Sequence, residues 1–259
     1  MRLFLIPIST RRTLVYAQRL NKITLAEPSY ADKASAKAAN VWLQWETGKA
    51  GWQRWITDAG NKLFNRIHHE EWSLKSIPPL SARRKDRGAD KQKIEVLYPP
   101  SVIKEKNVSP ILQRLATERN RIHRTRMIWS IVGMPIVAPF AIVPVIPNIP
   151  FFYLLYRAFS HWKALSGAKH LEFLLSRNLL APTPAASLES VYRPIVLEMG
   201  SGKKDSGGLA HAEVMLIRKG HAQEIASVTG IPALAVECER AYKQVEEHIK
   251  EDLKKKKLE

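Results

Sequence analysis

Three ionisable side chains just beyond a long apolar stretch are the candidates for proton-linked chemistry: His161, His170 and Glu172. A histidine has an ordinary pKa of about 6.5, so a modest change of surroundings makes it a proton switch at physiological pH. His170 and Glu172 are two positions apart, and such residues face different directions on a helix. The alternative is an ordinary interfacial histidine beside a solvated glutamate.

Other motifs that could do chemistry do not assemble into a site. Residues 68–71 (His-His-Glu-Glu) are metal-ligand types, but adjacent residues cannot all converge on one ion. Residues 200–203 (Gly-Ser-Gly-Lys) lack the spacing and the Ser/Thr of a phosphate-binding loop. The single cysteine, Cys238, excludes an intrachain disulfide and a cysteine cluster. We therefore expect no enzyme activity, no cofactor and no bound metal.

The element that must position the candidate residues is an apolar segment, 127–156, that carries no charge over thirty positions. About 20 helical residues cross a bilayer, so a straight helix of this length is too long. Proline breaks a helix interior, which favours a helical hairpin with arms at about 127–143 and 151–165. The residues assigned to this membrane segment are Met127, Trp129, Pro135, Pro139, Pro144, Pro147, Asn148, Pro150 and Tyr156.

Two alternatives to the membrane hairpin remain: a single kinked span, and a hairpin buried in a soluble core. In lipid, backbone carbonyls freed by proline need partners that acyl chains cannot supply. We therefore expect a homo-oligomer or a membrane partner protein.

Charge gives the expected orientation and partner. The formal net charge is +17, and residues 1–126 hold 25 Lys+Arg against 11 Asp+Glu. Such a surface suits nucleic acid or an anionic leaflet, and the apolar segment favours lipid over nucleic acid. Both ends of the segment are cationic, so both hairpin ends are expected on the same, positive-rich side of the membrane, which in a mitochondrial inner membrane is the matrix. The basic collar around the segment is Arg119, Arg121, Arg124, Arg126 and Arg157.

The predicted fold class is a mainly α membrane protein: a Pro-rich apolar helical hairpin with a small α+β N-terminal head and a C-terminal helical pair. The expected parts are a basic head (1–107), a helical membrane region (108–180), a Pro/Ser/Gly linker (181–208) and a helical C-terminal module (209–259).

Within the head, a strand at 2–8 is expected to pair with a strand at 93–98, and the C-terminal helices to separate at 229–232. The opening residues, basic and free of acids, also fit a mitochondrial presequence. The alternative is the strand followed by a helix at 10–21, and the two readings are compatible if the segment is not cleaved.

Five segments together resemble the fungal mitochondrial potassium–proton exchange-related proteins, over residues 1 to about 180. They are residues 1–14 (MRLFLIPISTRRTL), 71–80 (EWSLKSIPPL), 97–100 (LYPP), 139–162 (PFAIVPVIPNIPFFYLLYRAFSHW) and 169–175 (KHLEFLL). The resemblance implies an integral inner-membrane protein needed for electroneutral K⁺/H⁺ exchange, which controls matrix volume. It implies no particular ion-binding residue.

The function expected from these observations is that of a subunit or regulator of K⁺/H⁺ exchange. A proton antiporter usually needs a titratable group such as Asp, Glu or His within the membrane, and residues 127–156 contain none of these and no Lys. The alternatives are a membrane-anchored scaffold or assembly factor without a transport role, and a basic nucleic-acid-binding protein.

Overall fold

The computed structural model describes residues 1–18, 67–80, 93–139, 149–201 and 213–258, with isolated positions between 37 and 58. The chain divides into two units, Met1–Gln18 with His69–Glu259, and Arg19–His68. The strands of the first unit are β1 (Arg2–Pro7), β2 (Thr13–Gln18), β3 (Ile94–Tyr98) and β4 (Leu180–Pro184). Its helices are α3 (His69–Ser76), α5 (Glu105–Thr117), α6 (Asn120–Val137), α7 (Ile149–Ser176), α8 (Ala186–Ser201), α9 (His221–Thr229) and α10 (Ala233–Leu258).

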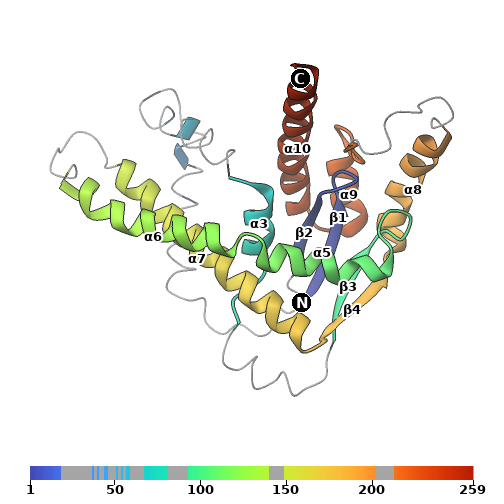
Figure 1. Ribbon diagram of the computed structural model, residues 1–259, viewed down its shortest axis with the longest axis horizontal. Coiled ribbons are helices and arrows are strands. Elements are labelled where there is room, and N and C mark those ends of the chain that lie inside the picture. Colours follow the sequence, from blue (N-terminus) through green and yellow to red (C-terminus); the bar gives the residue numbers. More distant parts are fainter. Residues whose placement is uncertain are drawn as a thin grey trace. The chain divides into compact units, whose positions relative to one another are not determined.

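The four strands form one mixed sheet in the order β2-β1-β3-β4 (Figure 1). β1 and β2 are antiparallel, whereas β1 pairs with β3 and β3 with β4 in parallel. The predicted pairing of strands at 2–8 and 93–98 is confirmed, with Leu3 opposite Val96. The helix expected at 10–21 is wrong over its described part. Residues 13–18 are rich in strand-forming side chains and return along β1 as β2.

Helices cover both faces of the sheet, because alternate side chains of a strand point to opposite faces. Phe4 and Ile6 of β1 join a core with α8, α9 and α10. Leu3 and Leu5 join a second core with α5 and α7. Helix α3 supplies hydrogen-bond acceptors for backbone N–H groups on the outer edge of β2. The backbone N–H groups of Val15 and Ala17 donate to the hydroxyls of Ser73 (3.2 Å) and Ser76 (3.0 Å), respectively.

The prediction of a mainly α membrane protein is wrong. The fold is α+β around the mixed sheet. Among the described residues, no helix combines the length and the apolar character needed to cross a bilayer. The apolar segment contributes instead to α6 and α7, which lie side by side (Figure 1). Pro144, Pro147 and Asn148 lie outside the described residues.

Residues 181–208, expected as a linker, instead supply most of β4 and all of α8 in their described part. Prolines dominated that expectation, but β4 pairs with only one described strand, and an edge strand tolerates residues without an N–H. In α8, Leu188 and Tyr192 are fully buried, and the Tyr192 hydroxyl donates to the carbonyl of Pro7 (2.9 Å). The prediction of a linker is therefore wrong over 181–201, and residues 202–208 lie outside the described residues.

The predicted separation of two C-terminal helices at 229–232 is confirmed. α9 ends at Gly230, whose φ of 68° is the left-handed conformation that glycine adopts without strain. The backbone N–H of Ile231 donates to the carbonyl of Ala226 (3.0 Å), which closes the helix end. α10 then starts at Ala233, directly after Pro232.

α3 and α7 approach each other closely at Gly167. A Cβ atom at this position would overlap the carbonyl oxygen of Leu74, which is backbone and cannot rotate away. Leu74 packs there against Ala164 and Ala168. Small residues on this stripe of α7 therefore allow α3 to lie against it.

We predict that Gly167→Ala destabilises the protein by about 2–3 kcal/mol, because overpacking forces α3 and α7 apart. The matched control is Gly133→Ala on α6, where the added Cβ would lie 3.0 Å from the flexible Leu154 side chain. Alanine is otherwise favoured over glycine inside a helix by about 1 kcal/mol. Urea unfolding measures both variants, and equal stability of the two would contradict the close contact.

Candidate functional site

A cluster of ionisable side chains is buried where three helices meet. Glu71 comes from α3, His123 from α6 and His161 from α7. Their exposed fractions are 2%, 3% and 1%, respectively. Burying such groups is costly unless they are paired, so their partners determine what the site can do.

The carboxylate of Glu71 is held by two residues of α7. The Arg157 guanidinium donates to both of its oxygens, at 3.0 Å to Oε1 and 3.3 Å to Oε2. The hydroxyl of Ser160 donates to Oε1 at 2.6 Å. Fork-shaped pairing of this kind is the strong form of an ion pair, and it joins α3 to α7.

The hydrogen bonds fix the protonation of the two histidines. A nitrogen of Arg157 lies 2.9 Å from Nε2 of His161, and since a guanidinium only donates, Nε2 must accept. The proton of neutral His161 is therefore on Nδ1, which lies 3.0 Å from Nδ1 of His123 and donates to it. The proton of His123 is then on Nε2, which is buried and has no hydrogen-bond partner among the described residues.

Burial and nearby cations keep this cluster in one charge state. Burial lowers the pKa of His161 to about 4. The negative charge of Glu71 raises this pKa, and the positive charge of Arg157 lowers it further. Burial also lowers the pKa of His123. For Glu71, burial raises the pKa, but the Ser160 hydrogen bond and the charge of Arg157 outweigh it, and the net pKa is lowered. At neutral pH the cluster therefore holds one ion pair and two uncharged rings.

A lysine with aromatic neighbours adjoins the cluster. The ammonium of Lys75 lies 3.6 Å from the centre of the Trp72 ring and 3.3 Å from the hydroxyl of Tyr156. Burial lowers the pKa of Lys75 to about 8 and raises that of Tyr156 to about 12. Tyr156, assigned to the membrane segment, is thus half-buried beside α3.

Only His161 among the three predicted proton-linked residues belongs to the cluster. Nδ1 of His170 lies 2.7 Å from the carbonyl of Pro78. Glu172 accepts a hydrogen bond from the side-chain amide of Asn120 at 3.1 Å. The structure therefore distributes the three residues along α7.

The predicted basic collar separates into two groups. Arg121, Arg124 and Arg126 are exposed on α6. Arg119 forms an ion pair with Glu70, and Arg157 is the buried partner of Glu71. Arg157 therefore acts as a counter-ion inside the protein.

The residues of the apolar segment include several in contact with solvent. Trp129 is 70% exposed, and Pro135, Pro139 and Pro150 are exposed as well. Met127 is partly buried. Gly133 of α6 faces Leu154 of α7, so the two arms of the apolar segment pack on each other.

Sequence reasoning missed Glu71 and His123 as members of the site. Glu71 ends the acidic and histidine-rich run 68–71, and His123 lies among the arginines of the collar. The histidines and acids next to Glu71, and the arginines on either side of His123, were the signal in the sequence that these residues could be ionisable partners. Their convergence depends on how three helices pack, which spacing along the chain does not encode.

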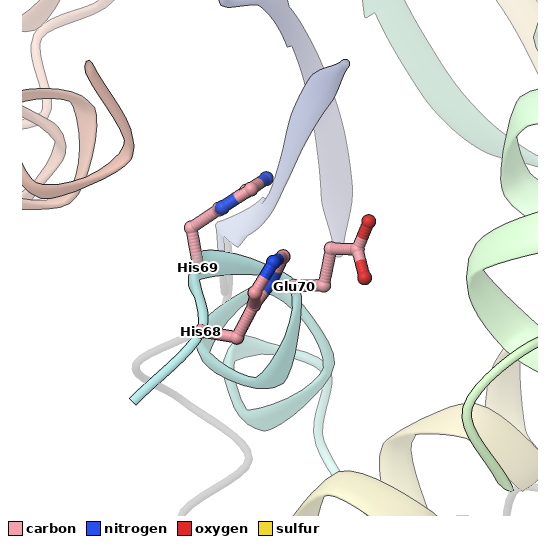
Figure 2. A group of neighbouring side chains, drawn as sticks. All are labelled: His68, His69 and Glu70. Atoms are coloured by element: carbon pink, nitrogen blue, oxygen red, sulfur yellow. The ribbon is translucent and has the colours of Figure 1, made fainter. Parts of the chain in front are cut away.

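The first residues of the run 68–71 have other partners. Figure 2 shows His68, His69 and Glu70 as neighbours at the start of α3, and a possible ligand atom of His69 lies within 4.8 Å of one of Glu70. Nδ1 of His69 lies 3.4 Å from the side-chain oxygen of Gln244 on α10. Glu70 pairs with Arg119. These two side chains therefore fasten α3 to α10 and α6.

The fold and the site define an α+β protein that holds a buried ionisable cluster between helices. The model of a family described as mitochondrial K⁺-H⁺ exchange-related matches residues 2–175. The chain belongs to this family, and Glu71, His123, Arg157 and His161 all lie within the matched residues. The mitochondrial relation expected from the resemblance is confirmed at the level of the family description.

Two fungal relatives are similar to the chain. An uncharacterized protein of Schizosaccharomyces pombe is 25% identical over 195 residues, covering 74% of this chain and 83% of the relative. An uncharacterized protein of Saccharomyces cerevisiae is 27% identical over 195 residues, covering 66% of this chain and 61% of the relative. The chain thus spans about three fifths of the length of the second protein. No solved structure matches significantly.

We predict that acid weakens the fold between about pH 6.5 and pH 4. Burial lowers the pKa of His69 and of His161 to about 4, from an ordinary 6.5. The unfolded chain therefore binds protons first, and the stabilisation is complete above pH 6.5 and lost as the pH falls. Each histidine adds a slope of about 1.4 kcal/mol per pH unit.

Urea unfolding at stepped pH tests this expectation. His161→Gln should reduce the slope, whereas the control His248→Gln, at an exposed residue of α10, should leave it unchanged. An unaltered slope in His161→Gln would show that His161 titrates normally in the folded protein.

Proposed function

We propose that the protein supports electroneutral K⁺/H⁺ exchange across the mitochondrial inner membrane as a subunit or regulator, and so controls matrix K⁺ and volume. The family description supports the relation to exchange. The observation that supports a place at the membrane is an exposed apolar surface on α6 and α7, called here the apolar face.

The apolar face combines large side chains that a soluble surface seldom displays together. Its most exposed members are Ile128, Trp129, Ile131, Val132, Ile136, Phe152 and Leu155. The exposed arginines Arg121, Arg124 and Arg126 precede it on α6. Basic residues beside apolar and tryptophan side chains suit an anionic lipid surface, where the cations meet headgroups and the apolar groups meet acyl chains.

A role as subunit or regulator fits the described residues better than that of an ion carrier. Residues 127–156 contain no Asp, Glu, His, Lys or Arg that could exchange a proton beside lipid. The buried carboxylate of Glu71 is already bound by Arg157 and Ser160. K⁺ would have to displace a guanidinium that donates to both oxygens of this carboxylate.

The apolar face also favours a second candidate, a membrane-attached scaffold or assembly factor without a transport role. Such a protein would use the same surface for attachment. The two proposals differ in time course, because an exchanger subunit acts continuously and an assembly factor acts only while new complexes form.

We expect mitochondria to swell several-fold more slowly in potassium acetate after rapid depletion of the protein. Acetic acid enters and releases a proton, and swelling then requires exchange of that proton for K⁺. Ammonium acetate is the control, because ammonia carries the base across without an exchanger. Normal swelling directly after depletion, with a defect only generations later, would support the scaffold.

We expect the double variant Trp129→Ser, Ile136→Ser to bind vesicles of phosphatidylcholine and cardiolipin about tenfold more weakly, because two exposed apolar side chains are lost. The matched control is Val236→Ser with Leu253→Ser, two exposed apolar residues of α10. Co-sedimentation measures both variants, with pure phosphatidylcholine vesicles testing the contribution of the arginines. Equal binding by the two double variants would contradict attachment through the apolar face.

A further inference from the structure

We propose that Glu71, His123 and His161 form a binding site for a divalent transition metal ion of the zinc type. Each residue offers one ligand atom, and these atoms all lie within 4.8 Å of one another. Two imidazoles and one carboxylate are a ligand set that zinc accepts, with a fourth position left for water or another ligand. The inference does not depend on the proposed role in ion exchange.

The distances between the ligand atoms suit a small ion. Zinc lies about 2.0–2.2 Å from its nitrogen and oxygen ligands, which places tetrahedral ligands about 3.3–3.6 Å apart. The two Nδ1 atoms are 3.0 Å apart, and Nδ1 of His161 is 3.8 Å from Oε2 of Glu71. The remaining pair, His123 and Glu71, is within 4.8 Å, so completing the geometry requires these side chains to move closer together.

The tautomer of His123 suits a metal ligand. Its ring is 3% exposed, and its Nε2 has no hydrogen-bond partner among the described residues. With its proton on Nε2, the ring presents the lone pair of Nδ1 to the place where the three ligand atoms converge.

Metal binding requires a change at His161. Its proton is on Nδ1, so coordination through this atom moves the proton to Nε2 and leaves the ring neutral. Nε2 would then donate, and Arg157, which donates to Nε2 at 2.9 Å, must withdraw. The guanidinium therefore competes with the metal for His161 as well as for Glu71, and its charge opposes a second cation.

This competition gives an unusual expectation for Arg157→Gln. The variant removes one cation beside Glu71 and frees Nε2 of His161, so it should bind metal about tenfold more tightly than the natural chain. A purely structural cluster predicts no metal binding in either protein. Arg157→Gln also removes the counter-ion of Glu71, so circular dichroism must first show that this variant is folded. The direction of the change in metal affinity then separates the two accounts.

The experiment is titration of the purified full chain with Co²⁺, followed by its visible absorption, with Zn²⁺ as competitor. We expect tetrahedral-type absorption at one equivalent and displacement by Zn²⁺. His123→Ala should weaken binding about a hundredfold, and Arg157→Gln should strengthen it. The matched control, His221→Ala on α9, should leave binding unchanged, because His221 lies outside the cluster.

Two outcomes would overturn the proposal. The first is no Co²⁺ binding by either the natural chain or Arg157→Gln, which would leave the cluster as a hydrogen-bonded core. The second is binding that survives His123→Ala but is lost in His68→Ala, which would assign the ion to the neighbouring histidine run. Circular dichroism of each variant, compared with the natural chain, establishes that the fold is retained.

Discussion

A carboxylate buried between helices requires a cation beside it, and the pairing of Glu71 with Arg157 meets this requirement across α3 and α7. Removing one partner of such a pair typically costs about 3–5 kcal/mol, because the other charge stays buried. The pair fixes more than two helices. α3 supplies Ser73 and Ser76 to the edge of β2, so the position of Glu71 is tied to the sheet through one short helix.

Short sequence patterns correctly predicted single elements, such as one strand and the end of one helix. The alternation in residues 93–98 indicated a strand, and Gly230 with Pro232 indicated the end of α9. Residues 13–18 misled, because six residues fit a strand or a helix end equally well until β1 lies beside them. Prolines in β4 indicated a loop, but only the sheet order shows that they lie on an edge strand.

The candidate site was predicted only in part, for a physical reason. His161 was identified from its distance to the apolar segment, but its partners come from α3 and α6. Packing of small residues, Gly167 above all, brings these helices within reach, and a glycine in a helix carries no sign of which backbone will approach it. Arg157 was expected beside lipid headgroups, and its burial with Glu71 became evident only from the packing.

The order of pairing in the sheet has a consequence for how the protein folds. β1 and β2 precede β3 and β4 along the chain, yet β1 also pairs with β3, and β3 with β4. Parallel pairing of segments so far apart in the sequence forms slowly. The chain loses the entropy of closing a long loop before the contacts between the strands can stabilise it. A chain threaded into an organelle from its N-terminal side would therefore deliver β1 and β2 before β4, and their hairpin would need protection from aggregation until β4 arrives.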